Sequence, residues 1–349
     1  MTDELYIAGC ASWLPRAVPV AEAVASGAFP ESEAVRTGMQ AVRIAAEEDS
    51  AADMAARAAR LALRRAGRDP AEIGLLLHAT LYDQGHDLWG AASYVQALAL
   101  GTGPSACPAV EIRQVSNGGM AAVELAGAFL RAGGSSATAL LTAGDVFCPP
   151  AFDRWRADPG TVYADGGAAL VLARSTGFAC LRALVTVSDP GLERMHRGDH
   201  AFRPPADGGV RRVDLEECKE QYLARHGMRA TVERAARGQR SAVEGVLAEA
   251  KVELADIARF VLPHLGRRRL ESAFFRPFGI APERTTWPWS RGVGHLGAGD
   301  QFAGLARLVE DRQVGPGDLV LLLGVGAGFT WSAAVVEILE VPDWSAPER

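Results

Sequence analysis

The feature of this sequence that most constrains its fold is a pattern of elements that occurs twice. The segment "GRDPAEIGLLLHAT" (67–80) reads as a helix end, an acidic turn and an apolar strand, and "KVELADIARFVLPHL" (251–265) repeats that order. Small residues then lead into a strand both in "ADGGAALVLA" (164–173) and in "GVGAGFTWSAAVVEI" (324–338). The alternative is a chance match of common elements. We interpret the pattern as a duplication, because similarity between distant segments indicates a repeated architecture.

This interpretation predicts an N-terminal half, residues 1–173, and a C-terminal half, residues 174–349. A chain of 349 residues can bury a large core and is too long for one small domain. Continuous apolar strands alternate with amphipathic helices, such as the one expected within 48–67 after a Ser50 or Asp49 cap. This alternation predicts an α/β fold with a parallel or mixed sheet covered on both faces.

A stretch at about residues 189–240 differs from the rest of the chain. It is rich in Arg, Asp, Gly and Pro and then becomes helical and charged. We expect a surface insertion there, and long ordered insertions often form lids or entrance walls.

Composition excludes several classes of function. The net charge of −6 and the lack of a long basic run argue against nucleic-acid binding. We expect no membrane span and no signal peptide, because no apolar run approaches 18 residues and the N-terminus lacks a basic segment followed by an apolar one. The five cysteines are scattered singly, which fits neither a disulfide framework nor a metal site and favours the cytoplasm.

Ser116 is the first candidate for chemistry. It stands in "RQVSNGGM" (113–120), between the strand-like "VEIRQV" and a segment able to form a helix. At such a junction the backbone N–H groups and the helix dipole favour a developing negative charge. Serine is also an ordinary helix N-cap, and its hydroxyl becomes a good nucleophile only beside a base.

Two of the seven histidines could supply that base. His264 comes where an apolar strand ends, and strand ends commonly carry the chemistry of α/β enzymes. His295 is flanked by glycines and followed by Asp300, which could orient the ring, although a glycine-rich loop before a capped helix is the alternative. We expect a core position for His78 and surface positions for the remaining four, which are His86, His196, His200 and His226.

The glycine cluster "GVGAGFTW" (324–331) does not fit a phosphate-binding loop. It lacks the Lys-Ser/Thr pair of a P-loop and leads into a strand rather than a helix. A tight turn that offers backbone N–H groups as an oxyanion hole suits these residues better.

Taken together, these segments resemble β-ketoacyl-acyl carrier protein synthase III and its relatives in the thiolase superfamily. "YIAGCASWLP" is similar to the family's opening strand, "VLPHLGRRRL" to its strand-end histidine motif, and "GVGAGFTWSAAVVEI" to its closing turn and strand. The resemblance covers nearly the whole chain. It implies a five-layer αβαβα fold of two duplicated halves and a homodimer.

Two positions depart from the family pattern. Ser116 stands where the family carries its nucleophilic cysteine, and His295 stands where it carries an asparagine, while His264 matches the family histidine. Together with Asp300, this set is similar to a divergent branch of actinomycete polyketide pathways that transfers acyl groups or selects starter units. The resemblance implies an acyl-Ser116 intermediate, an oxyanion hole of the Ser116 and Ala327 N–H groups, and acyl-CoA or acyl carrier protein as substrate, without a further cofactor.

Two other functions stay open from the sequence. His264 and His295 could polarise a thioester carbonyl for decarboxylative condensation, or the chain could be a non-catalytic partner in a synthase complex. Arg267, Arg268 and Arg269 follow the His264 motif, and the resemblance implies that an acidic carrier protein docks there; a solvated helix face is the alternative. Trp287 and Trp289 could line an acyl pocket, but we expect them in the core.

Overall fold

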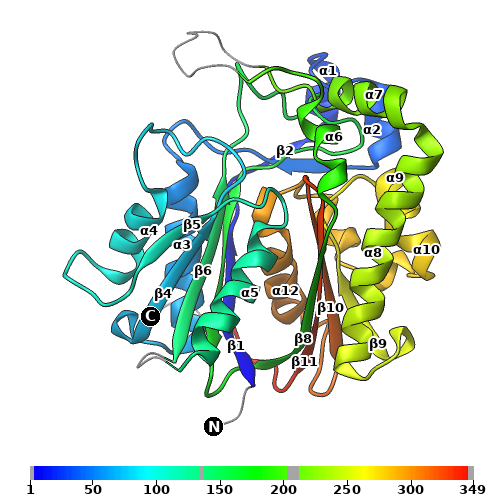
Figure 1. Cartoon of the computed structure of the whole chain (residues 1–349). Coiled ribbons are helices and arrows are strands. Elements are labelled where there is room, and N and C mark those ends of the chain that lie inside the picture. The colour runs from blue at the N-terminus through cyan, green and yellow to red at the C-terminus, as the bar shows by residue number, and fades with distance from the viewer. Residues whose placement is uncertain (1–3, 134–136, 203–211, 345–349) are drawn as a thin grey trace.

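The computed structural model describes residues 4–133, 137–202 and 212–344 (Figure 1). Its centre is a nine-stranded sheet in the order β5-β4-β6-β7-β1-β8-β11-β10-β9. The first five strands of this order are β5 (Ala109–Ile112), β4 (Ile73–Ala79), β6 (Thr138–Asp145), β7 (Gly166–Ala173) and β1 (Leu5–Trp13). The other four are β8 (Ala179–Ser188), β11 (Thr330–Ile338), β10 (Leu319–Gly326) and β9 (Ile257–Val261). A separate ribbon pairs β2 (Ala17–Pro19) with β3 (Ala41–Arg43).

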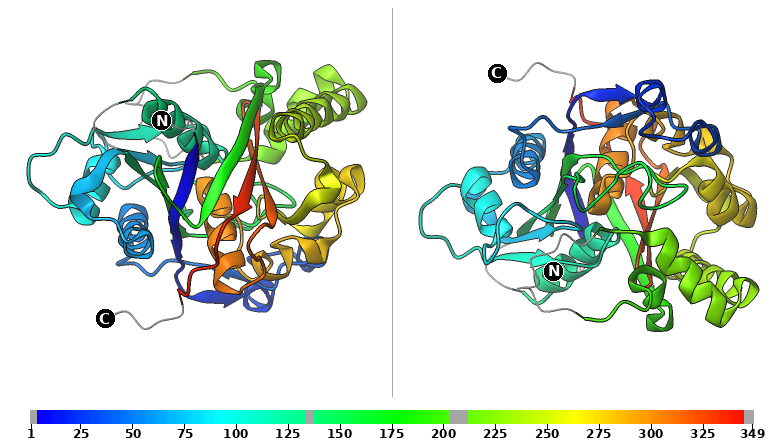
Figure 2. Two further views of the ribbon diagram at one scale, coloured as in Figure 1. Left: turned by 90° about the horizontal axis from the view of Figure 1, so that it is seen from below. Right: turned by 90° about the horizontal axis from the view of Figure 1, so that it is seen from above.

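Helices complete five layers, as Figures 1 and 2 show. The outer helices α3 (Ala51–Ala66) and α4 (Ala91–Leu100) cover the N-terminal strands, and α8 (Met228–Ala250) covers β8 and β11. Between the two halves lie α5 (Gly118–Arg131) and α12 (Asp300–Glu310), which contact strands of both. The predicted αβαβα fold is therefore confirmed.

The order of elements repeats along the chain. The first half runs β1, α3, β4, β5, α5, β6, β7, and the second half runs β8, α8, β9, α12, β10, β11. A single parallel bridge between Phe260 and Thr285 stands where β5 stands in the first half. The halves meet where β1 and β8 pair antiparallel, so α5 and α12 occupy equivalent places.

Small residues allow the outer helix α3 to lie close against the sheet. Its N-cap is Ser50, whose hydroxyl accepts the Asp53 N–H at 3.0 Å, and its C-cap is Gly67 with φ 60°. A Cβ added at Gly167 of β7 would lie 2.2 Å from the Met54 carbonyl oxygen, so only glycine fits there. The helix predicted within 48–67 is thus confirmed, with Ser50 rather than Asp49 as its cap.

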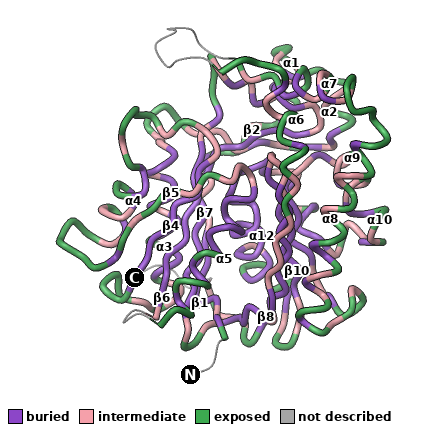
Figure 3. Tube along the Cα trace, in the orientation of Figure 1, coloured by how far each residue is buried: buried purple, intermediate pink, exposed green. Residues whose placement is uncertain are grey.

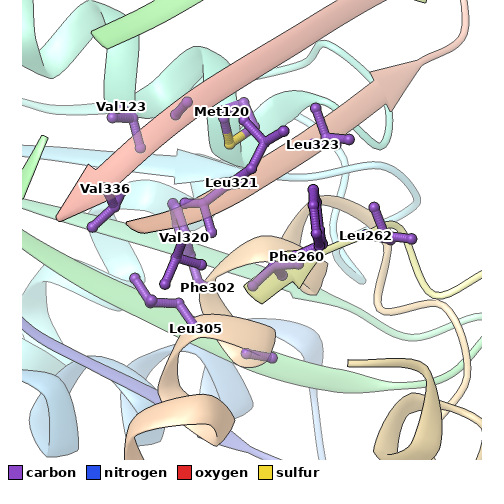
Figure 4. Close-up of a cluster of buried hydrophobic side chains, with 14 of the residues drawn as sticks. Met120, Val123, Phe260, Leu262, Phe302, Leu305, Val320, Leu321, Leu323 and Val336 are labelled. Carbon is purple, nitrogen blue, oxygen red and sulfur yellow. The ribbon is translucent and has the colours of Figure 1, made fainter. Parts of the chain in front are cut away.

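Strands β6 and β7 are buried along their whole length, and α12 is buried except at Arg307 and Glu310 (Figure 3). Apolar side chains from α5, α12 and the C-terminal strands fill the space between the halves, among them Met120, Phe260, Phe302 and Leu321 (Figure 4). Burial of this kind contributes about 25 cal/mol per Å² of apolar surface. The ends of α5 and α12 are thereby held firmly relative to each other.

The stretch 189–240 does not form one insertion. It holds α6 (Arg194–Arg197), α7 (Leu215–His226) and the first half of α8, which belongs to the outer layer. Lys219 on α7 pairs with the buried Asp158, which fastens α7 to the body of the protein. Residues 203–211, which the insertion was expected to include, lie outside the described residues.

The remaining helices are short and lie near the ribbon or the C-terminal half. They are α1 (Val20–Ala25), α2 (Glu31–Thr37), α9 (Arg267–Leu270), α10 (Arg276–Phe278) and α11 (Trp287–Ser290). Within the described ranges, none of the helices combines the length and the apolar character that a bilayer crossing requires.

Candidate active site

Ser116 lies just ahead of α5, one residue before its N-cap, Asn117. The preceding strand ends at Ile112, earlier than "VEIRQV" suggested, and the chain turns sharply through Val115, whose φ is +50°. This left-handed conformation is rare for a β-branched residue and marks a constrained turn. The turn presents a half-buried Ser116 at the interface of the two halves.

Glycines allow the Ser116 turn to approach the other half. A Cβ at Gly119 would lie 2.4 Å from the Ala298 carbonyl oxygen, and one at Gly326 would lie 2.4 Å from the Gln114 carbonyl oxygen. Any larger residue would push these segments apart. The start of α5 therefore packs directly on the 297–299 turn and on the glycine turn after β10.

The packing brings three of the four predicted residues into one hydrogen-bonded chain. Ser116 Oγ lies 2.8 Å from His295 Nε2, and His295 Nδ1 lies 2.6 Å from Asp300 Oδ2. Ser116 and His295 are 179 residues apart in sequence. A nucleophile, a base and a carboxylate that orients the base form the arrangement that activates a serine hydroxyl.

Asp300 is fully buried at the start of α12, where the helix dipole favours its negative charge. Besides His295, it accepts the backbone N–H of His264 at 2.8 Å and of Leu296 at 2.8 Å. Burial alone would raise its pKa, but the adjacent His264 and His295 and these hydrogen bonds hold the pKa below its usual value. Asp300 is therefore an anion at neutral pH.

His295 is the middle residue of this hydrogen-bonded chain and is nearly completely buried. Burial alone would lower its pKa, but the charge of Asp300 and the hydrogen bond between them outweigh burial and raise the pKa above the ordinary histidine value. Because Asp300 accepts from Nδ1, the neutral ring has its lone pair on Nε2, facing Ser116. This is the tautomer that a general base for Ser116 requires.

His264 lies three residues beyond the end of β9 and shares the same carboxylate. Its Nδ1 is 3.1 Å from the Gly294 carbonyl oxygen and 3.1 Å from Asp300 Oδ1, whereas its Nε2 is buried and has no hydrogen-bond partner. Burial lowers the pKa of His264 despite the nearby Asp300. The ring is therefore neutral, with its proton on Nδ1 and a bare acceptor at Nε2.

The other histidines divide into core, surface and one exception. His78 is fully buried against Thr142, as expected, and His86, His200 and His226 are exposed. His196, expected at the surface, is half-buried: its ring packs on Phe329, with centroids 5.3 Å apart, and burial lowers its pKa to about 4. Phe329 directly follows the glycine turn, and this contact across 133 positions has no local sequence signal.

The glycine cluster forms the hairpin turn between β10 and β11, with Ala327 at its start. Gly324 and Gly326 pack against Asn117, whose amide donates to Ser332 Oγ at 2.8 Å. The turn therefore borders the Ser116 loop. The oxyanion hole of the Ser116 and Ala327 N–H groups remains a prediction.

A cavity of about 520 Å³ with more basic than acidic side chains lies between the 155–160 segment and α9. Arg36, Arg156 and Arg268 line it together with two carboxylates, Glu33 and Glu216. Of the three predicted docking arginines, Arg268 is exposed, Arg267 pairs with Glu271, and Arg269 is bound to the buried Asp158 through two hydrogen bonds.

Both tryptophans pack with the core, as expected, but to different depths. Trp287 is buried in the core, whereas Trp289 is half-buried and meets the His264 ring edge-on, with ring centroids 5.3 Å apart.

Within the part of the chain that the structure describes, no group of three His, Cys, Asp or Glu side chains is arranged to hold a metal ion.

The chain is similar in sequence to known proteins over most of its length. Residues 247–338 match the family model of the 3-oxoacyl-[acyl-carrier-protein] synthase III C terminal. The β-ketoacyl-[acyl-carrier-protein] synthase III of Rhodospirillum rubrum is 31% identical over 337 residues, which cover 95% of this chain and 98% of that protein. The enzyme of the same name from Rhizorhabdus wittichii is 30% identical over 86% of this chain and 88% of its own length.

Solved structures agree with this likeness. The structure of the acyltransferase ChlB3 superposes with a TM-score of 0.90 at 35% identity and covers 97% of this chain and 98% of its own. The priming β-ketosynthase of the R1128 polyketide pathway has a TM-score of 0.76 at 21% identity and covers 97% of both chains, which shows a shared fold.

Proposed function

The chain belongs to the β-ketoacyl-[acyl-carrier-protein] synthase III family, and on that premise we propose that it is an acyltransferase of polyketide biosynthesis that carries a short acyl group as an ester on Ser116. The observation that supports this most is the chain Ser116–His295–Asp300, with contacts of 2.8 and 2.6 Å. The 35% identity to an acyltransferase over nearly the whole chain favours the same function. The donor is an acyl-CoA or an acyl carrier protein, and the acceptor is a carrier thiol or a natural-product hydroxyl.

The first half-reaction acylates Ser116. His295 Nε2 removes the hydroxyl proton as Oγ attacks the thioester carbonyl, and the resulting imidazolium is stabilised by Asp300. The N–H groups of Ser116 and Ala327 are proposed to bind the oxyanion, where losing one donor typically costs about 3–4 kcal/mol. The C–S bond then breaks, and the imidazolium gives its proton to the leaving thiolate.

The second half-reaction reverses these roles. Neutral His295 removes the proton of the acceptor thiol or hydroxyl as that group attacks the ester carbonyl. The bond between the acyl carbon and Ser116 Oγ breaks, and the imidazolium returns the proton to Oγ. The enzyme is regenerated without a further cofactor.

The arrangement of the histidines favours transfer over decarboxylative condensation. Condensation leaves a negatively charged enolate that needs N–H donors around it. His264 Nδ1 faces two acceptors, the Gly294 carbonyl and Asp300, and the low pKa of the ring keeps Nε2 without a proton. A bare Nε2 would repel an enolate oxygen, whereas it can accept the hydrogen of an S–H or O–H group.

The basic cavity supports an acidic partner. Gly160 lines it, and two residues later the Val162 carbonyl accepts the backbone N–H of His295, so the cavity and the base lie on one segment. A carrier protein would be steered by the net positive charge of the arginines that line the cavity, of which Arg36, Arg156 and Arg268 are exposed, while Arg36 pairs with Glu33 and Arg269 with Asp158. The proposed docking surface is therefore wider than the arginine triplet of the sequence.

We also propose the homodimer that the family resemblance implies. Strand β5 is an edge of the sheet, and exposed apolar side chains lie on it and on its neighbours α4 and α5. An uncovered edge with apolar side chains is a surface that a partner strand can pair with. These side chains are Leu98, Val110, Leu125 and Phe129.

A product assay separates the three functions. The protein is incubated with acetyl-, propionyl- and malonyl-CoA and a holo acyl carrier protein, and products are identified by mass. We expect acyl-carrier protein without release of carbon dioxide. A ketoacyl product together with carbon dioxide would establish condensation instead, and an inert protein that binds the carrier protein would favour the non-catalytic role.

A further inference from the structure

The position of the His295 ring depends on a segment that the triad itself does not include. The His295 N–H donates to the Val162 carbonyl at 2.9 Å, and its carbonyl accepts the Ala164 N–H at 2.8 Å. Between these two residues, Tyr163 places its ring edge-on against the imidazole, with centroids 5.1 Å apart. Residues 162–164 thus hold both the backbone and the ring of His295.

A buried arginine fixes that segment. Arg154 Nη1 donates to the Tyr163 carbonyl at 3.2 Å, and its Nη1 and Nη2 form a bidentate pair with Asp165, both at 2.9 Å. The Arg154 carbonyl also accepts the Tyr163 N–H at 3.2 Å. Arg154 is 8% exposed and Asp165 is 1% exposed.

Asp165 in turn ties the segment to two other parts of the chain. It accepts the Phe147 N–H at 2.8 Å and the Ala45 N–H at 2.8 Å, and its own N–H donates to the Arg43 carbonyl at 2.9 Å. Each of the two carboxylate oxygens therefore accepts one hydrogen bond from Arg154 and one from a backbone N–H. Bidentate arginine–carboxylate pairs of this kind fix geometry more rigidly than a lysine could.

We propose that Arg154 is a positioning residue for His295: with Asp165 it holds residues 162–164 so that the imidazole bridges Ser116 and Asp300. The inference rests on the proposed acyl transfer and names a residue on which that reaction depends. Two contacts of 2.8 and 2.6 Å must exist together, so a displacement of the ring by about 1 Å breaks one of them and can cost about 100-fold in rate. Replacing both partners of a buried ion pair together is often nearly neutral for stability, so the loss expected when Arg154 and Asp165 are both replaced is in rate rather than in folding.

The test compares two arginines of similar setting. Arg65 also binds a backbone carbonyl, that of Cys10 at 2.9 Å, and a carboxylate, Glu310 at 2.8 Å, but it contacts none of the triad residues. The double variant Arg154→Met/Asp165→Asn removes the clamp without leaving an unpaired charge, Arg154→Lys keeps one charge without the fork, and Arg65→Met is the control. Each is measured for the acylation rate constant and the donor Kd in single-turnover experiments.

We expect the double variant to acylate about 30- to 100-fold more slowly with a donor Kd within twofold of wild type, Arg154→Lys to fall in between, and Arg65→Met to keep the wild-type rate. A second readout needs no turnover: the proton between His295 Nδ1 and Asp300 should give a far-downfield resonance in the wild type that His295→Gln removes. The double variant should lose or shift this resonance, and Arg65→Met should keep it.

The outcomes are separable. A folded double variant with the wild-type rate and an unchanged resonance would overturn the role of Arg154, as would an equal rate loss in Arg65→Met. If the wild type forms no acyl adduct, the proposed function fails, yet the resonance still decides whether Arg154 positions His295.

Discussion

The two halves of the molecule share an architecture and differ in what stands at one equivalent place, the start of the central helix. In the N-terminal half, Ser116 stands two residues before α5, directly ahead of the N-cap Asn117. In the C-terminal half, the first residue of α12 is Asp300, whose carboxylate binds His295. The starts of the two helices therefore carry different residues of the proposed triad: the nucleophile in one half and the carboxylate that orients the base in the other.

The largest expected effect comes from removing the base contributed by the C-terminal half. Replacing His295→Ala leaves Ser116 without a proton acceptor, and loss of such a base costs about 10⁴–10⁶ in rate. The rate of adduct formation by intact mass spectrometry measures it. Acylation at the wild-type rate would mean that the halves do not cooperate as described.

Replacing Asp300→Asn tests the orienting role separately from the base. The amide can donate to His295 Nδ1 and so stabilise the wrong tautomer, for which we expect a loss of about 10⁴-fold. Asp311→Asn, at the end of the same helix, is the control and should acylate normally. If Asp300→Asn were no slower than this control, the carboxylate would have only a structural role.

Two glycines on the central helices test whether the acylation rate depends on the contact between the halves or on packing within one half. Gly119→Ala on α5 would press on the Ala298 carbonyl oxygen and lengthen the contact between Ser116 and His295, which should cost about 100-fold in rate. Gly304→Ala on α12 would press on the Val261 side chain inside its own half and should lower the melting temperature more than the rate. Equal rate losses in Gly119→Ala and Gly304→Ala would show that the contact between the halves has no special effect on the acylation rate.

The pH dependence should be the mildest of these effects. His295 must be neutral to act as a base, and Asp300 raises its pKa above the ordinary value, so acylation should slow about tenfold for each unit of pH below that pKa. Asp145 is a second group whose ionisation could contribute to the profile, because burial raises its pKa to about 7. The profile should therefore persist in Asp145→Asn, and a profile that disappears there would assign it to Asp145.

Much of the site could be predicted from sequence because the signals were local. The glycines around His295, the Asp300 that follows and the strand end before His264 each occupy a short stretch. The repeat predicted two related halves, and the family resemblance implied the layered fold. No short pattern encodes the contact of His196 with Phe329 or the pairing of residues 162–164 with His295, because both join distant segments of the chain. The same reason explains why Arg154 had no signal: it is one arginine among many until folding buries it beside Asp165.

The most direct test of the central claim is the covalent state of Ser116. Wild type and Ser116→Ala are mixed with a panel of short acyl-CoA donors, quenched in acid, and read by intact mass and peptide mapping. We expect one acyl group per wild-type chain, located on Ser116, and none on the variant. An unmodified wild type, or an equal adduct on Ser116→Ala, would contradict the account.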